Sequence, residues 1–379
     1  MKVLVVGHAY IASINREKWR VFAKKFSDIK LKILIPKKWS ATLFNINAGD
    51  LSEYNSDNCE FISINTFKSG NEVLYGYNFF ALIKLLKKFK PDLIHVEQGD
   101  NAFSYFQLIF LSKIFCRKAK FIFFTWVNWK NKWSLKYKLF WKFIEKFNLK
   151  NSSGAIVGNI DAAKILREKK FTKPLETLLQ LGVNEKYFIP ARKINNNKFK
   201  IGFIGRLIKE KGILDLVRAF NYLKKFHFNW ELMFVGDGKN KMDLINYINK
   251  LNLSSNVKIL DPVDHTQVGS LLSSFDIFVL PSYDTEFWRE QFGHVLIEAM
   301  ACKVPVIGST GGEIPKVIGD SGLIFEQKNI NDLVEKLKNL MDNKILREKL
   351  SLKGYDRFKN NFSYEIIAKK TYAFWKSIF

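Results

Sequence analysis

Cysteine is scarce in this chain, and its scarcity excludes several architectures. Only three of the 379 residues are cysteines, Cys59, Cys116 and Cys302, and they lie far apart. Thiols this few and this scattered exclude a disulfide framework and a four-ligand zinc site. They favour a reducing, cytosolic compartment.

Long apolar segments are missing as well. The most apolar helical stretch, 103–115, is shorter than the roughly 20 residues that span a bilayer, and it contains Lys113. Met1 leads directly into the apolar run 2–6, without the longer apolar core and cleavage site of a secretory signal. We therefore expect no transmembrane segment, no export and a cytoplasmic protein.

Acidic residues are few relative to basic ones. The chain has 61 lysines and arginines against 36 acidic residues, a formal net charge of +25. Residues 101–150 alone hold eleven basic residues and one acidic residue. An anionic partner is therefore expected on that part of the chain. A general bias toward lysine and asparagine is the alternative explanation for most of the excess.

Short runs rich in Val, Ile and Phe alternate with longer helical patterns, which is typical of strand–helix units in parallel sheets. The length of 379 residues suits two domains. We predict an α/β protein of two doubly wound, Rossmann-like domains, 1–190 and 199–362, joined by a linker at 191–198. A C-terminal helix at 363–379 is expected to pack back on the first domain.

The strands predicted for the first domain are 2–6, 31–35, 92–96, 121–124 and 154–157. Those predicted for the second domain are 200–204, 232–235, 257–260, 277–280, 305–307 and 323–325. Helices in the second domain are expected to begin near Gly212, Lys239, Gln267, Gly293 and Asn331.

A phosphate site is predicted where the first strand of the second domain ends. Gly205 and Arg206 follow this strand, and Lys211 and Gly212 precede a helix. A cation at a helix N-terminus opposes the helix dipole, and a bound anion reverses that penalty. Gly236 follows the next strand at the same sheet edge, where it either turns the chain or lets it approach a ligand. A solvated basic loop is the alternative to the phosphate site.

Two carboxylates mark a second feature. Glu298 lies in an apolar helix that begins at Gly293, and Glu290 lies just before this helix. Because a buried carboxylate needs hydrogen-bond donors, Glu298 suits either the hydroxyls of a ribose or sugar diol or a structural pair with lysine or arginine. Glu290 can bind a second group of hydroxyls in the same crevice.

Taken in order, these segments resemble retaining glycosyltransferases of family 4 with the GT-B fold. The resemblance is carried by Gly205-Arg206, Lys211-Gly212, Gly236-Asp237-Gly238, the run from Glu290 to Ala301, and the run from Pro305 to Pro315. It implies two domains that face each other across a cleft, with a nucleotide-sugar donor held by the second.

The resemblance also implies a role for each donor-binding residue. Arg206 and Lys211 bind the diphosphate beside Gly205 and Gly236, Glu298 binds the ribose, and Glu290 binds the transferred sugar. The backbone at Phe292 and Gly293 lies near the donor. No cofactor and no metal are expected, and the sequence has no Asp-x-Asp element.

The acceptor is expected on the first domain. The loop after its first strand supplies His8 and Asn15 as candidates, and a later strand end supplies His95 and Glu97. Glu97 could bind the acceptor hydroxyl or receive its proton. A hydrogen-bonded core residue is the alternative for His95.

The expected function is transfer of a sugar, with retention, from a nucleotide-diphosphate sugar to a hydroxyl of a lipid-linked or cell-surface glycan. This activity would serve polysaccharide or lipopolysaccharide assembly. A GT-B nucleotide-sugar epimerase and a non-catalytic glycan- or nucleic-acid-binding protein are the alternatives. No RNA-binding motif accompanies the basic residues, so nucleic acid is not expected as a partner.

Residues 117–150 combine lysines with many aromatic rings, among them Trp126, Trp129, Trp133 and Trp141. Such a segment suits the surface of an anionic membrane, on the inner face of the plasma membrane. A core helix with solvated lysines is the alternative.

Overall fold

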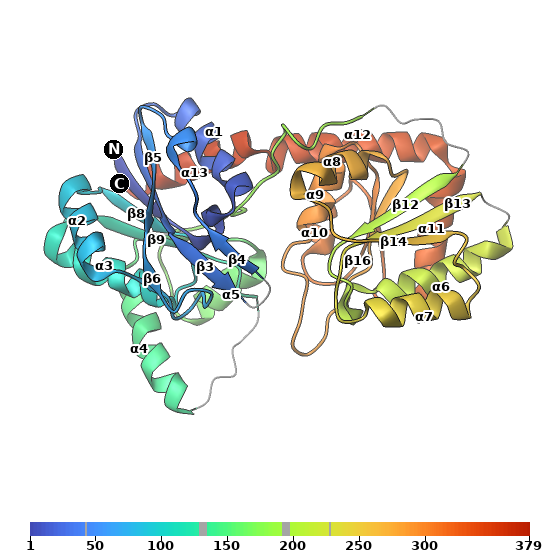
Figure 1. The fold of residues 1–379 in the computed structure, drawn as a ribbon, viewed down its shortest axis with the longest axis horizontal. Coiled ribbons are helices and arrows are strands. Elements are labelled where there is room, and N and C mark those ends of the chain that lie inside the picture. The colour runs from blue at the N-terminus through green and yellow to red at the C-terminus, as the bar shows by residue number, and fades with distance from the viewer. Residues whose placement is uncertain (42–43, 129–134, 192–197, 227–228) are drawn as a thin grey trace. The chain divides into compact units, whose positions relative to one another are not determined.

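The computed structural model describes residues 1–41, 44–128, 135–191, 198–226 and 229–379 (Figure 1). Contacts divide the chain into two units: Met1–Gly182 together with Tyr364–Phe379, and Val183–Ser363. Val183 joins the second unit because its amide donates to the Phe362 carbonyl at 3.1 Å. Most of the linker predicted at 191–198 lies outside the described residues.

The first unit contains a parallel sheet of seven strands in the order β11-β10-β9-β8-β1-β2-β5. The strands are β1 (Lys2–Val6), β2 (Lys30–Pro36), β5 (Cys59–Ile64), β8 (Leu93–Val96), β9 (Lys120–Thr125), β10 (Gly154–Val157) and β11 (Leu175–Thr177). Its helices are α1 (Glu17–Lys25), α2 (Phe79–Phe89), α3 (Phe103–Phe115), α4 (Leu135–Asn151), α5 (Ile160–Glu168) and α13 (Tyr364–Ser377). Two antiparallel hairpins complete it, β3 (Lys38–Ala41) with β4 (Phe44–Asn47), and β6 (Thr66–Phe67) with β7 (Gly76–Tyr77).

The second unit contains a parallel sheet of six strands in the order β14-β13-β12-β15-β16-β17. The strands are β12 (Phe199–Ile204), β13 (Trp230–Val235), β14 (Val257–Leu260), β15 (Ile277–Leu280), β16 (Val306–Ser309) and β17 (Leu323–Phe325). The helices are α6 (Ile213–Leu223), α7 (Lys241–Lys250), α8 (His265–Ser273), α9 (His294–Ala301), α10 (Ile314–Ile318), α11 (Ile330–Asp342) and α12 (Lys344–Asn361).

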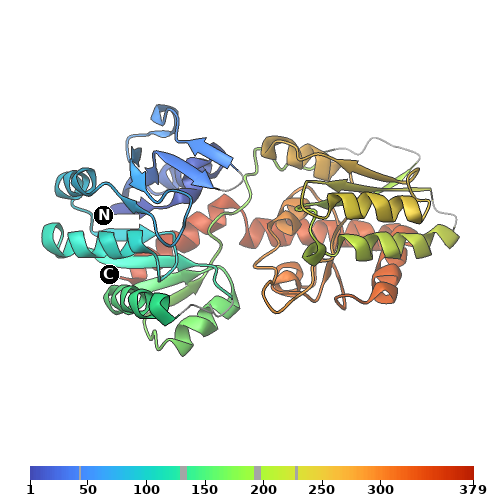
Figure 2. The same ribbon diagram turned by 60° about the horizontal axis from the view of Figure 1, so that its bottom comes forward.

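Both sheets have the strand order of a Rossmann fold, and helices cover both faces of each sheet (Figures 1 and 2). Strands covered on both faces are apolar throughout, and β8, β10, β15 and β16 are buried along their whole length. The predicted α/β class with two Rossmann-like domains is confirmed.

The strand order reverses between β1 and β8 in the first unit and between β12 and β15 in the second. In such sheets, ligands bind beside the carboxyl ends of the strands at this reversal. The segments that begin at Gly7, Glu97, Gly205 and Pro281 follow these four strand ends. The fold therefore positions two candidate sites, one on each unit.

The C-terminal helix α13 packs against α1 within the first unit. Trp375 stacks on Trp19 with ring centroids 5.7 Å apart, and Tyr372 stacks on Phe26 at 4.1 Å. Both tryptophans are fully buried. In the part of the chain that the structure describes, no helix is both long enough and apolar enough to cross a bilayer.

Candidate functional site

Two glycine loops lie back to back at the carboxyl ends of β12 and β13. Gly205 and Gly236 have φ values of +155° and +147°. A Cβ added to Gly236 would lie 2.0 Å from the carbonyl oxygen of Gly205, so the backbones leave no room for a side chain. Leu207 donates its amide to Asp237 at 2.8 Å, which ties the second loop to the first.

Lys211 and Glu290 form an ion pair between the start of α6 and the loop after β15. The Lys211 Nζ lies 2.5 Å from Glu290 Oε2, and both side chains are largely buried. Ser282 donates its hydroxyl to the same oxygen at 2.9 Å. The Lys211 ammonium also lies 5.4 Å from the centre of the Trp288 ring. The structure thus brings together two residues that lie 79 positions apart.

Arg206 extends from the same loop as Gly205, and its side chain is exposed. It forms no ion pair with any residue that the structure describes. Its guanidinium is therefore available to an anion at the edge of the sheet.

Glu298 lies on α9 and is only 5% exposed, as predicted from its apolar neighbours. Its Oε1 lies 2.9 Å from Nε2 of His265 and 3.1 Å from Nδ1 of His294. Burial alone would raise the pKa of this carboxyl, but the two histidines outweigh burial and lower the pKa to about 2. Two histidines hold the carboxylate in place of the lysine or arginine that the structural alternative supposed.

Gly293 directly precedes α9, so Glu290 lies in the loop before this glycine and Glu298 lies on the helix after it. Its φ of +79° is one that glycine adopts readily. An added Cβ would lie 2.9 Å from Leu280 and 3.7 Å from Glu290. Phe292 is half-buried, and its ring contacts Phe362 at 5.8 Å.

On the first unit, Glu97 lies in a buried cluster rather than at an open surface. Its Oε1 accepts from Lys18 Nζ at 2.7 Å, and its other oxygen accepts from the Tyr10 hydroxyl. Lys18 also donates to the Gln180 carbonyl at 2.6 Å. Burial raises the pKa of Glu97, but Lys18 outweighs this effect and the pKa is lowered. Both carboxylate oxygens are thus occupied.

His95 lies in the core of the first unit. Its ring is 1% exposed and meets Trp19 and Trp375 edge-on at 6.3 and 5.7 Å. Neither ring nitrogen has a hydrogen-bond partner among the described residues. Burial lowers its pKa to about 4, so this histidine is neutral at pH 7. The ring of His95 thus packs against Trp19 of α1 and Trp375 of α13.

His8 and Asn15 lie in the loop after β1. His8 stacks on Trp39 with ring centroids 4.6 Å apart, and its two nitrogens lie near Gln98 and Glu72. Asn15 donates its side-chain amide to the Ala9 carbonyl at 2.8 Å, which fixes the loop. Both residues are partly exposed, and both are held in place by contacts within the first unit.

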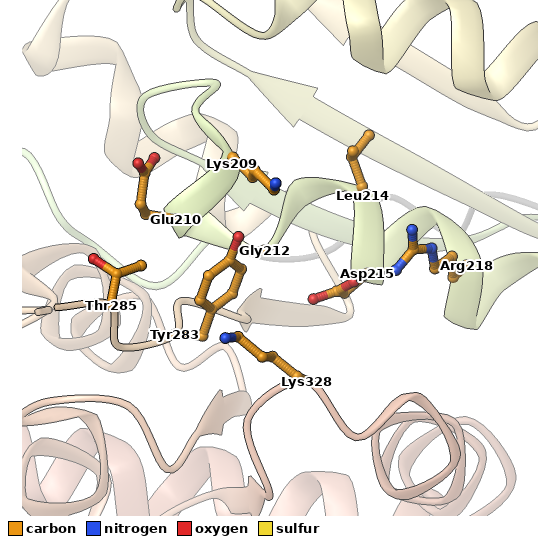
Figure 3. A pocket seen from close by; sticks show the side chains of 9 residues that line it. All are labelled: Lys209, Glu210, Gly212, Leu214, Asp215, Arg218, Tyr283, Thr285 and Lys328. Carbon is orange, nitrogen blue, oxygen red and sulfur yellow. Dashed lines mark hydrogen bonds and ion pairs between the residues drawn. The ribbon is translucent and has the colours of Figure 1, made fainter. Parts of the chain in front are cut away.

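A pocket of about 640 Å³ opens beside the start of α6 (Figure 3). Lys328 and Asp215 point toward the ring of Tyr283, and the Lys328 ammonium lies 4.5 Å from the centre of that ring. The lining residues are Lys209, Glu210, Gly212, Leu214, Asp215, Arg218, Tyr283, Thr285 and Lys328. None of the predicted donor-binding residues lines this pocket.

Four residues of these clusters were not predicted from the sequence: Tyr10, Lys18, His265 and Ser282. The sequence pattern could have identified Lys18 as a buried residue, because it lies on the same face of α1 as the apolar Phe22. A cation at an apolar position indicates a buried partner. No comparable signal marks His265, whose partner lies 33 residues away.

Comparison with known proteins gives a family match and individual relatives. The family model of glycosyl transferases group 1 matches residues 185–357. A capsular polysaccharide biosynthesis glycosyltransferase of Staphylococcus aureus is 33% identical over 193 residues, 49% of this chain and 47% of that protein. An uncharacterized glycosyltransferase of Methanocaldococcus jannaschii is 30% identical over 290 residues, 71% of this chain and 67% of that protein. The chain spans about half the length of the first curated relatives that it matches.

Among solved structures, the Anabaena protein HepE in complex with UDP is similar over the whole chain. The alignment covers 100% of both chains with a TM-score of 0.72 and 15% identity. At this identity, the similarity concerns the fold.

Proposed function

The chain belongs to the family of glycosyl transferases group 1, and from this premise we propose that it transfers a sugar from a nucleotide-diphosphate sugar to a hydroxyl acceptor. The predicted GT-B fold is confirmed by the two Rossmann-like sheets and by the similarity to HepE. Family membership favours transfer over the epimerase and over a non-catalytic binding protein.

The observation that carries the proposal is the cluster at the strand reversal of the second unit. Lys211, Glu290 and Ser282 are joined by direct contacts there, and the exposed Arg206 lies in the loop between β12 and Lys211. Glu298 lies one helix turn beyond Gly293 with its charge held by two histidines. Cations and carboxylates at one sheet edge suit a ligand that has both phosphates and hydroxyls.

Each group has a role in the proposed reaction. The bond between the anomeric carbon and the diphosphate oxygen breaks, and the electron pair leaves on the nucleoside diphosphate. Arg206, Lys211 and the amino end of α6 stabilise that negative charge as it develops. Glu298 accepts hydrogen bonds from the ribose hydroxyls, and Glu290 accepts them from the transferred sugar.

We propose retention of configuration and catalysis without a metal, as the family resemblance implies. The acceptor oxygen attacks the face that the diphosphate leaves, and its proton passes to the departing phosphate oxygen. The enzyme then needs no strong base, which agrees with a Glu97 whose oxygens are both occupied. Turnover that persists in EDTA and an NMR assignment of the product anomer test these two proposals.

The proposed acceptor is a lipid-linked or cell-surface glycan, and it meets the loop of His8 on the first unit. A relative that acts in capsular polysaccharide biosynthesis supports this acceptor class. The contact between Glu97 and Tyr10 ties the end of β8 to this loop, so the cluster acts by holding the loop.

A panel of UDP- and GDP-sugars, screened by thermal shift and then by hydrolysis, tests the proposed donor. A true donor raises Tm by mass action and is slowly hydrolysed without an acceptor. Glu298→Ala and Arg206→Ala should each greatly reduce the shift. Full donor affinity and turnover in both variants would contradict the proposal, whereas a new sugar isomer from the donor alone would point to the epimerase.

A further inference from the structure

The outer face of α3 and α4 exposes large apolar side chains. Phe110 and Ile114 on α3 are 47% and 52% exposed, and Phe140 and Phe143 on α4 are 56% and 61% exposed. Exposed apolar residues that stand singly are normal, but a contiguous group marks an interaction site.

The rings form one connected aromatic patch, with Phe106 at its centre. Its ring centroid lies 4.9 Å from that of Phe147, 6.2 Å from that of Phe110 and 6.4 Å from that of Phe143. The patch continues through Phe103 to Phe67, at 5.9 and 5.8 Å. We define the aromatic patch as Phe67, Phe103, Phe106, Phe110, Phe143 and Phe147.

The patch is an additional apolar face and not the core-facing side of α4. The core side of this helix is formed by Trp141 and Ile144, which are 4% and 1% exposed. Phe140, Phe143 and Phe147 follow at positions i, i+3 and i+7, so they share another side of the helix. The helix has thus one apolar side for the fold and a second that Phe106 of α3 covers only in part, since Phe140 and Phe143 stay more than half exposed.

Positive charge surrounds the aromatic patch. Lys113 on α3 and Lys142, Lys146 and Lys150 on α4 are exposed, and the Lys113 ammonium lies 5.5 Å from the centre of the Phe147 ring. The single acidic residue of 101–150, Glu145, shares the ammonium of Lys169 with Asp100, so the four lysines still outnumber the negative charge on this face.

We propose that the aromatic patch and its lysines dock the first unit on an anionic lipid bilayer. Phenylalanine has no polar tip and enters the boundary between headgroups and acyl chains, while lysines are attracted by anionic headgroups. Arginine is the preferred residue for nucleic-acid recognition, and only one of the eleven basic residues in 101–150 is arginine. The composition therefore favours lipid over nucleic acid.

The structure changes the extent of the surface predicted at 117–150. Trp141 lies in the core, 120–125 is the sheet strand β9, and α3 contributes rings that the prediction left out. Trp129 and Trp133 lie outside the described residues. The docking surface is therefore formed by the helices α3 and α4, joined by Phe67 of β6 through its contact with Phe103.

This inference rests on the proposed function, because an enzyme that acts on a lipid-linked acceptor meets that acceptor at a bilayer.

The test is sedimentation of the full chain with vesicles of phosphatidylcholine, with or without 30% phosphatidylglycerol. We expect at least tenfold tighter binding to the anionic vesicles, and weaker binding as salt rises. Equal binding to both vesicles would overturn the proposal.

Two pairs of variants locate the surface. Phe110→Ser/Phe143→Ser and Lys142→Glu/Lys146→Glu should each weaken binding at least tenfold. The matched controls are Ile345→Ser/Leu352→Ser, two exposed apolar residues of α12, and Lys369→Glu/Lys370→Glu, which changes the net charge equally on α13. Wild-type binding by both patch variants, or an equal loss in the controls, would refute the assignment.

Donor hydrolysis in solution, measured on the same variants, separates this proposal from the proposed function. Patch variants should hydrolyse the donor at the wild-type rate and lose only vesicle binding. Vesicle binding without any donor hydrolysis would contradict the proposed function and leave the docking surface standing.

Discussion

At the scale of single residues, Glu298 combines burial with a carboxyl pKa of about 2, against an ordinary value of 4.5. At about 1.4 kcal/mol for each pKa unit, the charged form is favoured in the folded state by at most ~3–4 kcal/mol. The half-exposed His265 lowers this figure, since solvent screens its charge. A lowered carboxyl pKa stabilises the fold above pH 4.5, and this contribution is lost as the pH falls toward 2.

We predict that His265→Ala/His294→Ala raises the pKa of Glu298, because burial then acts unopposed. Acid unfolding should begin at a higher pH than in the wild type, and donor affinity should fall in the same range as the carboxylate becomes protonated. Denaturant midpoints and donor titrations between pH 3 and 8 measure both effects. An unchanged pH profile would show that the histidines do not control this carboxylate.

Lys211 is largely buried and Arg206 is exposed. Substitution of Lys211 should therefore change both the free energy of unfolding and donor binding, whereas substitution of Arg206 should change donor binding alone. Lys211→Ala leaves the 8% exposed Glu290 without its cation, which should cost about 1–3 kcal/mol of unfolding free energy. Arg206→Ala removes an exposed side chain and should leave stability unchanged. Each variant should weaken donor binding about 10- to 100-fold, since one charged hydrogen-bond partner of the diphosphate is lost.

Urea unfolding and donor titration of the same samples check this pair of expectations. Lys211→Arg serves as the conservative control and should restore most of the stability. Wild-type donor affinity in Arg206→Ala would remove this residue from the proposed site.

At the scale of elements, β8 lies where α1 and α13 meet, and His95 is its titratable residue in the core. The pKa of His95 is lowered to about 4 from 6.5. The unfolded chain binds this proton more readily, so the stability of the fold decreases as the pH falls from about 6.5 to 4. We predict that His95→Leu flattens the pH dependence of unfolding in this window.

The same variant decides between the two interpretations of His95. A core residue can be replaced by an apolar one of similar size with little loss of turnover. A drop in kcat of two orders of magnitude without loss of stability would instead support the catalytic role. The kcat and stability of Glu97→Gln, measured in the same way, show what the cluster of Glu97, Lys18 and Tyr10 contributes.

Strands could be predicted where both faces are buried, because such strands are continuous apolar runs. Strand β5, Cys59–Ile64, was missed because Glu60 and Ser63 interrupt its apolar pattern. Helix α12 was missed because Leu350, Gly354 and Phe358 are its few buried residues among many charged ones. Helix α8 begins at His265 instead of Gln267, since Asp264 accepts from the Thr266 amide at 2.9 Å and caps the helix there.

At the scale of the whole molecule, the local sequence predicts the positions of the candidate donor residues in the fold better than it predicts which residues they contact. Arg206 and Lys211 lie within one loop and helix start, so strand and helix patterns suffice to place them at a sheet edge. The partner of Glu97 is Lys18, 79 positions away. Such pairs depend on which elements the fold brings together, and a single sequence does not give that information.

The division into two units predicts two unfolding transitions that respond to different changes. Trp375 is fully buried against Trp19 in the first unit, so Trp375→Ala should destabilise that unit by about 3–5 kcal/mol. UDP, or whichever nucleotide the donor screen identifies, should stabilise the second unit, by about 2.7 kcal/mol at a hundredfold excess over Kd. Differential scanning calorimetry should show one transition lowered by the variant and the other raised by the nucleotide. A single transition that shifts with both changes would mean that the two units unfold as one.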